Sequence, residues 1–371
     1  MKRSKLCVLL LLICLLLSSC SSKSPQLPKI ENFNTISLGS FERESNEDAR
    51  ILYANSSKIL VNISFDYQEG DPAYHEVGLN SQTKYLAIYN TENLSCISCL
   101  DVNEREYCIS GILLQDEVVY SAVYYDVQHS AYEYRITRVS KDGQRTIIEQ
   151  GACPGTGYDE PYLKTLGADV FAYSYHNISD NTFGVNIVLG NNNIEQQLRL
   201  EGNNGAEHFM SLFRGNGFQY VYYAKVDGKG TVFVGDADGI QHQFCLDEGE
   251  QIYDYCFLND AKAILFTKLG TSASHKDDQL VIRSLEGTLL GVVESGPCYR
   301  LESDNLYSAL CINEKYQPHL ITVSEDMQNI QIDSLDISSQ PMLFYSIAPA
   351  KFLIHNYTCL DDTELLSLFG G

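Results

Sequence analysis

Three cysteines close together in the sequence are the first side chains whose types and spacing could support chemistry. Cys96 and Cys99 are separated by two residues, and Cys108 follows them. Thiolates at such spacings bind metal ions or exchange disulfides. A zinc site needs a fourth ligand, no His lies close in sequence, and the segment is predicted to lie between strands instead of at the helix start of a thioredoxin-type pair. Buried thiols or a disulfide are therefore the favoured interpretation.

Acidic and histidine-containing segments give weaker signals. Residues 235–239 read Gly-Asp-Ala-Asp-Gly, which places two carboxylates among glycines as calcium loops do, but the further acids of such loops are missing. A structural hairpin is the favoured interpretation. His75 and Glu76 begin a zinc-protease pattern, but Leu79 stands where the second His is required. The sequence has no Gly-x-Ser-x-Gly elbow and no Gly-Lys-Ser/Thr phosphate loop. We predict no metal site and no cofactor.

The elements that must position any site are predicted to be short strands. In the segment 118–126, Tyr120, Ala122 and Tyr124 alternate with their neighbours, as residues on one face of a strand do. No segment after residue 20 shows a sustained apolar pattern at helical spacing. The fold class is therefore predicted to be all-β.

The predicted strands recur with a fixed period. Turn residues at Gly143, Asn191, Gly239 and Gly287 are each 48 residues apart. Periods of 40 to 50 residues with four strands per unit are typical of a β-propeller. The second strand of each unit is expected at residues 58–61, 118–120, 170–173, 218–221, 263–266, 306–309 and 352–354.

These units predict a seven-bladed β-propeller, with six or eight blades and a pair of β-sandwiches as alternatives. The last unit, from about Pro341, has room for three strands, and an unpartnered strand is expected at 34–38. We therefore predict that the N-terminal strand completes the last blade and closes the ring. The pattern resembles the propellers of TolB-like and quinoprotein-like bacterial proteins in architecture only, because no repeated Trp-Asp signature is present.

A propeller fold would place candidate binding residues where the chain enters the innermost strand of each blade. The entrances are expected at 46–48, 158–160, 207–208, 253–254, 299–300 and 344–345, which are acidic and aromatic with one Arg. Such a mixture suits a sugar, a cationic peptide or a protein partner. The predicted ligand-binding residues are Asp48, Asp159, Glu160, His208, Tyr253, Asp254, Tyr299, Arg300 and Tyr345. The alternative is that these entrances are solvated and bind nothing.

The N-terminal segment predicts where the protein is located in the cell. Basic residues at 2–5 precede an apolar run over 6–17, which at 1.5 Å per residue would span about 18 Å, short of the roughly 30 Å hydrocarbon layer. The run ends in Leu17-Ser18-Ser19-Cys20, which resembles the lipobox of bacterial lipoproteins. That resemblance implies a signal peptide (1–19) and acylation of Cys20, which would hold the chain at the extracytoplasmic face of the cell membrane. The rest of the chain is then expected to be a lipidated tether (20–29) and the predicted propeller domain (30–371). The alternative is an ordinary signal peptide with a chance Cys.

The amino-acid composition limits the classes of molecule that the protein is expected to bind. The chain has 371 residues, 44% of them hydrophobic, and a formal charge of −22, which disfavours nucleic-acid binding because such a field repels phosphates. We expect a monomeric binding or scaffolding lipoprotein for an envelope protein, peptide or glycan. One alternative is a glycoside hydrolase that uses the acidic rim, which would require two convergent carboxyls. Another is a solute-binding lipoprotein of two α/β lobes, which the lack of helical periodicity disfavours.

Overall fold

Every secondary-structure element in the described part of the chain is a β-strand. The computed structural model describes residues 29–37, 44, 46–67, 81–103, 105–115, 117–126, 128, 130–153, 163–165, 170–177, 182–189, 193–200, 208–214, 217–236, 238–247, 251–259, 262–270, 277–296, 298–304, 306–313, 315, 317–335, 343–348, 351–355 and 362–369. Within these ranges, no helix is long and apolar enough to cross a membrane. The predicted signal peptide, Cys20 and the tether up to residue 28 lie outside the described residues.

The described strands form seven four-stranded antiparallel sheets. The first strands are β2 (Glu47–Ala54), β6 (Tyr107–Leu114), β10 (Leu163–Thr165), β14 (His208–Arg214), β18 (Gln251–Leu258), β22 (Cys298–Ser303) and β26 (Leu343–Ala348). The second strands are β3 (Lys58–Asp66), β7 (Glu117–Asp126), β11 (Val170–Asn177), β15 (Gly217–Val226), β19 (Ala263–Leu269), β23 (Ser308–Asn313) and β27 (Lys351–His355). The third strands are β4 (Ser81–Asn90), β8 (Ala131–Val139), β12 (Thr182–Leu189), β16 (Lys229–Asp236), β20 (Gln279–Ser284), β24 (Pro318–Val323) and β28 (Asp362–Phe369). The fourth strands are β5 (Cys96–Asp101), β9 (Arg145–Ala152), β13 (Asn193–Leu200), β17 (Gly239–Cys245), β21 (Leu289–Ser295), β25 (Ile330–Ser334) and, in the sheet of β26, β1 (Lys29–Ser37).

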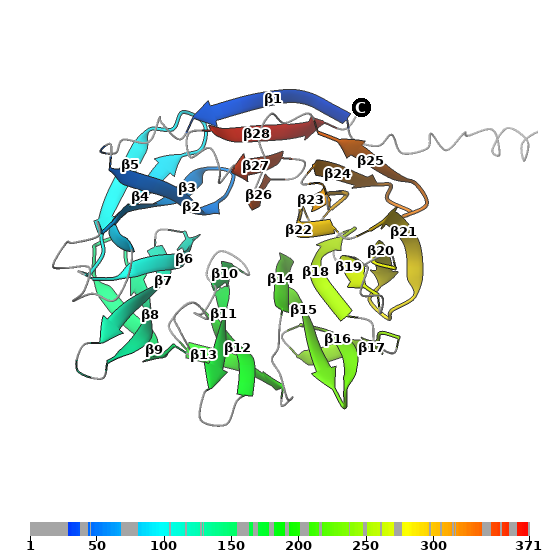
Figure 1. Cartoon of the computed structure of the whole chain (residues 1–371), viewed down its shortest axis with the longest axis horizontal. Coiled ribbons are helices and arrows are strands. Elements are labelled where there is room, and N and C mark those ends of the chain that lie inside the picture. The colour runs from blue at the N-terminus through cyan, green and yellow to red at the C-terminus, as the bar shows by residue number, and fades with distance from the viewer. Residues whose placement is uncertain are drawn as a thin grey trace, which may run out of the picture.

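The sheets are arranged around a common centre. Each first strand contacts the first strand of the next sheet along the chain, and β26 contacts β2. Figure 1 shows the first strands nearest the centre, with β1 and β28 at the outer edge. This arrangement is a β-propeller, and all the predicted entrances in the described residues lie on its inner strands.

The second strands carry the largest share of the buried hydrophobic residues. The predicted second strands fall within β3, β7, β11, β15, β19 and β27, whereas the one predicted at 306–309 begins two residues before β23. The alternation in 118–126 predicts that Tyr120, Ala122 and Tyr124 share one face, and β7 is in fact buried on both faces from Val118 to Val123. Neighbouring sheets cover both faces of each second strand, so apolar side chains occupy successive positions.

The turns between third and fourth strands explain the sequence period. Gly143, Gly239 and Gly287 lie in such turns with φ of 79°, 114° and 90°. This left-handed region is open to glycine without a steric penalty. Asn191, the fourth predicted turn residue, lies outside the described residues.

The two ends of the chain meet in one sheet. The strand expected at 34–38 is β1, and it pairs antiparallel with β28, with Asn34 opposite Leu365. One buried cluster also joins Ile347 and Leu353 of the last sheet to Ile51 and Val61 of the first. Apolar packing therefore continues across the junction between the first and last sheets.

Candidate ligand-binding face of the inner strands

The structure places the predicted binding residues in neighbouring inner strands. Asp48 lies in β2, His208 in β14, Tyr253 and Asp254 in β18, Tyr299 and Arg300 in β22, and Tyr345 in β26. Each lies in the first half of its strand. Because successive sheets repeat one strand order, the starts of their first strands lie on the same side of the ring. Asp159, Glu160 and the side chain of His208 lie outside what the structure describes.

Tyr253 and Tyr299 form an aromatic pair across the β18–β22 contact. Their ring centroids are 4.9 Å apart, and the ring planes meet at 76°, which is the edge-to-face arrangement that aromatic rings prefer. Tyr253 is 47% exposed, which makes it one of the large hydrophobic side chains at the surface of the described chain. Two rigid rings that share one contact present a preformed amphipathic surface.

Tyr253 and Arg300, which are both exposed, lie at interruptions of the strand ladder. In β18, Ile252 lies opposite Lys268 and Asp254 opposite Thr267, so Tyr253 is an extra residue in a β-bulge. In β22, the register shifts between Tyr299 and Glu302, and Arg300 has a φ of 56°. Bulges re-aim side chains and are frequent beside functional sites. A non-glycine residue at positive φ is also a strained conformation that tends to occur at such sites.

Asp254 has a structural role that the sequence analysis did not foresee. Its Oδ1 accepts a hydrogen bond from the Tyr255 N–H at 2.8 Å, and its Oδ2 accepts one from the Leu301 N–H at 2.8 Å. The carboxylate therefore ties β18 to β22. A glycosidase acid or nucleophile must instead face its substrate, and the glycoside hydrolase alternative is not supported.

Tyr345 also joins two sheets. Its hydroxyl donates a hydrogen bond to the Ile51 carbonyl at 2.7 Å, which links β26 to β2. Burial raises the pKa of Tyr345, so the phenol stays protonated and remains a donor. Tyr345 lies in the first half of β26, and its polar end is engaged within the protein.

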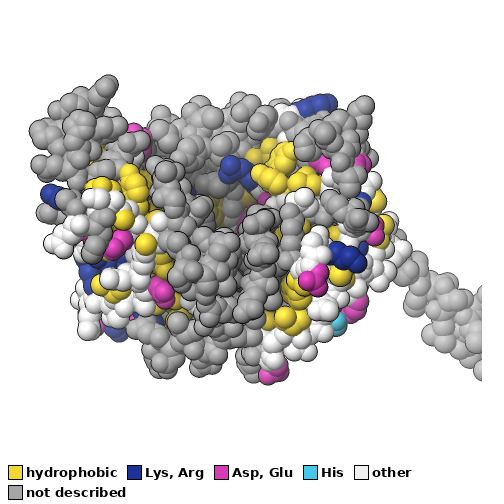
Figure 2. Space-filling model, turned by 60° about the horizontal axis from the view of Figure 1, so that its bottom comes forward, with side chains coloured by type: hydrophobic (Ala, Val, Ile, Leu, Met, Phe, Trp, Pro, Cys, Tyr) yellow, Lys and Arg dark blue, Asp and Glu magenta, His cyan; other side chains and the backbone are white. Residues whose placement is uncertain are grey.

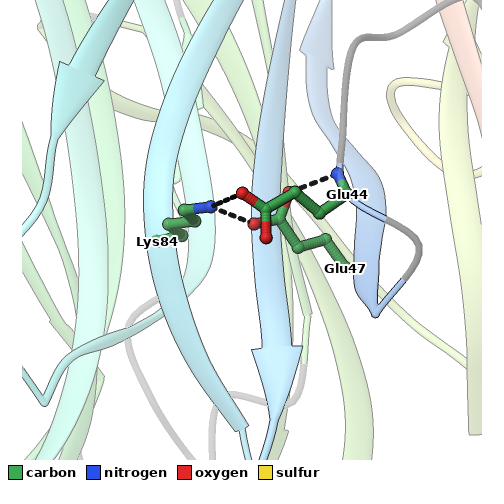
Figure 3. Close-up of polar contacts among 3 residues, drawn as sticks. All are labelled: Glu44, Glu47 and Lys84. Atoms are coloured by element: carbon green, nitrogen blue, oxygen red, sulfur yellow. Dashed lines mark hydrogen bonds and ion pairs between the residues drawn. The ribbon is translucent and has the colours of Figure 1, made fainter.

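At the start of β2 the acidic entrance is neutralised by an ion pair. The Glu47 side chain is 3% exposed and pairs with the Lys84 ammonium, which also contacts Glu44 Oε1 at 3.2 Å. Glu47 Oε2 accepts a hydrogen bond from the Glu44 N–H at 2.9 Å. Figure 3 shows the two carboxylates converging on Lys84. Asp48 is half-buried beside this cluster and lies opposite Ser64 in the ladder.

The described part of the face thus combines aromatic rings with both acidic and basic groups, and the carboxylates of Glu47 and Asp254 are engaged within the protein. Figure 2 shows a hollow near the centre of one face, with hydrophobic and basic side chains at its edge. Arg50 and Glu302 are not among the predicted residues, yet their charges, with that of Arg300, act on the pKa of Tyr345. Both residues lie in inner strands, so their position in a predicted inner strand is the signal that could have identified them.

The other chemical candidates divide into exposed and buried groups. Cys108 is fully buried in β6, where burial raises its thiol pKa, while Cys96 and Cys99 are exposed in β5. The three thiols therefore do not form one site. Residues 235–239 form the hairpin between β16 and β17, in which Asp236 Oδ1 accepts the Asp238 N–H at 2.9 Å. Within the described ranges, no three His, Cys, Asp or Glu side chains are grouped to hold a metal ion. His75 and Glu76 lie outside those ranges.

Comparison with solved structures supports the fold. The β-propeller domain of the Trilobed protease from Pyrococcus furiosus, described as having an open velcro topology, aligns with a TM-score of 0.57 at 7% identity, over 89% of this chain and 96% of that one. Raptor from Chaetomium thermophilum aligns with a TM-score of 0.55 at 7% identity, over 94% of this chain and 29% of that one. A chain of the mitotic checkpoint complex aligns with a TM-score of 0.52 at 10% identity, over 94% of both chains.

Sequence comparison adds no family to these structural likenesses. No family model matches the chain, and no curated protein matches it. At identities of 7–10% the solved structures show the β-propeller fold alone.

Proposed function

We propose that the chain is a lipid-anchored, extracytoplasmic β-propeller that binds a protein, peptide or glycan of the cell envelope through its inner-strand face. The observation that carries this proposal is the pairing of Tyr253 with Tyr299 beside Arg300, with two of the three residues at bulges. Aromatic and Arg side chains contribute a large share of binding energy at protein surfaces. The fold is consistent with a protein-interaction scaffold.

The chemistry of this face favours a ligand with an apolar surface beside a carboxylate or hydroxyl. Ring faces and edges pack against aliphatic or sugar C–H groups. A guanidinium donates hydrogen bonds to oxygen acceptors, most strongly to carboxylates. Because Asp254 is bound to two backbone amides, Arg300 supplies the exposed charge next to the aromatic pair.

The proposed architecture is a seven-bladed ring closed by β1. Support comes from the seven sheets, the contact of β26 with β2, and the pairing of β1 with β28. In this arrangement residues 30–371 form one propeller domain, and β1 lies at its outer rim. A tether over residues 20–29 would then be attached away from the inner-strand face and leave it accessible.

The binding proposal is tested by site-specific photo-cross-linking in native membranes. A photoreactive phenylalanine at position 253 is expected to give a discrete cross-linked adduct, and adding Arg300→Ala should reduce its yield severalfold. The matched control places the same probe at Ile147, which is 53% exposed on the outer strand β9. Equal adducts from both positions, or none from position 253, would contradict the proposed face.

The anchor is tested separately, because a binding propeller does not require one. Metabolic labelling with a fatty acid should mark the wild-type chain and the Cys245→Ala variant but not Cys20→Ala. Several acyl chains hold a protein at a membrane far more firmly than one chain does, so Cys20→Ala should also leave the membrane fraction. Label that persists in Cys20→Ala would refute the lipoprotein assignment.

A further inference from the structure

The outer strand β5 carries two exposed thiols whose arrangement the proposed binding face does not use. The Sγ atoms of Cys96 and Cys99 lie 3.6 Å apart, and both side chains are exposed to solvent. β5 is the last strand of its sheet. The pair is therefore accessible from the rim of the molecule.

A β-bulge accounts for the closeness of these two thiols. Residues three apart in a regular strand point to opposite faces of the sheet. In β5, Ser98 lies opposite Ile88 but Cys96 lies opposite Tyr89, so Ile97 is an extra residue. The extra residue reverses the alternation and brings Cys96 and Cys99 to the same face. Ile97 itself is 52% exposed.

We propose that Cys96 and Cys99 form a chelating site for a thiophilic divalent cation of the zinc class. With metal–sulfur distances of about 2.3 Å, sulfurs 3.6 Å apart subtend an angle of about 103° at the metal. The ideal tetrahedral angle is about 109°, so little adjustment is needed. The two thiolates supply half of a tetrahedral shell, and water or another exogenous donor supplies the rest.

The same geometry disfavours a disulfide between these residues. An S–S bond is about 2.05 Å long, so the two sulfurs, which lie 3.6 Å apart, would have to move about 1.5 Å closer to form one. Chelation needs no such movement and leaves the pairs Ala87–Cys99 and Tyr89–Cys96 of the β4–β5 ladder in place.

Binding is a balanced exchange of protons for the cation. Each thiol loses its proton as its sulfur becomes a metal-bound thiolate, so one divalent cation releases two protons and no oxidant or reductant is needed. Tyr85 lies close enough for the charges of both cysteines to contribute to its raised pKa, after burial and the charge of Glu47. The phenol of Tyr85 therefore flanks the site as a neutral group.

The test is a cadmium titration of the full chain in detergent micelles, reduced and then freed of reductant. The wild type should show a thiolate-to-cadmium charge-transfer band that saturates near one equivalent, with release of two protons per ion. Cys96→Ser and Cys99→Ser should each weaken binding by more than about tenfold. The matched control is Cys245→Ser, because Cys245 is an exposed thiol in the outer strand β17, and it should leave the titration unchanged.

Two results would overturn the site. One is a wild-type titration with no thiolate band, and the other is equal weakening by all three serine variants. Far-ultraviolet circular dichroism of each variant checks that its β-sheet content is intact, so that a loss of binding is read only from a folded chain.

Discussion

At the scale of single residues, the Glu47–Lys84 pair makes stability depend on pH. Burial of the Glu47 carboxyl disfavours its charge, but hydrogen bonds from Lys84 and from the Glu44 N–H outweigh burial and lower the pKa of Glu47 below its ordinary 4.5. Hydrogen bonds to Glu47 and Glu44 raise the pKa of Lys84 above its ordinary 10.5. The stabilisation by Glu47 is complete above about pH 4.5 and is lost as pH falls through its lowered pKa. That by Lys84 is complete below about pH 10.5 and is lost as pH rises through its raised pKa.

Glu47→Gln removes this contribution. At neutral pH we expect the free energy of unfolding to fall by about 1–2 kcal/mol, the cost of losing charge-assisted hydrogen bonds at a buried carboxyl. Between neutral pH and about pH 3 the variant should lose less stability than the wild type, as measured by urea unfolding. Glu92→Gln is the control, because Glu92 is exposed. An equal acid sensitivity of wild type and Glu47→Gln would contradict this role.

At the scale of strands and turns, the chain can be predicted where local rules decide the structure. The apolar second strands follow such rules and are found where predicted, except that β23 begins two residues later than expected. Gly143, Gly239 and Gly287 likewise have the positive φ expected of turn glycines. The hairpin at 235–239 is also local, and it requires glycine at position 235, because any Cβ there would lie 2.3 Å from the Tyr220 ring. Packing against Tyr220 accounts for Gly235 without calcium binding.

The candidate site was less predictable, because its chemistry depends on the register between strands. The sequence placed Tyr253, Tyr299 and Arg300 at entrances but carried no mark of the bulges that re-aim them. It also suggested that Asp254 was available to a ligand, whereas the Leu301 N–H of the neighbouring sheet binds it. Alternation within one strand does not show which groups an adjacent sheet brings into contact.

At the scale of the whole molecule, the proposed binding face depends on a closed ring. The inner-strand face exists because neighbouring first strands contact one another around the centre, including β26 with β2. The chain as a whole has a formal charge of −22. Arg300 is among the exposed residues of the inner-strand face that the structure describes. An acidic molecule whose aromatic face carries an exposed Arg would repel most anionic surfaces while still binding a shaped ligand at that face.

The most direct test of the closed ring is hydrogen–deuterium exchange of the full chain across Lys29–Ser37. If β1 closes the last sheet by pairing with β28, its bonded amides should be protected by a factor of at least about a hundred over an unstructured peptide. The amides of β27, Lys351–His355, are the internal reference. Exchange of β1 at the unstructured rate, while β27 stays protected, would contradict closure of the ring by the N-terminal strand.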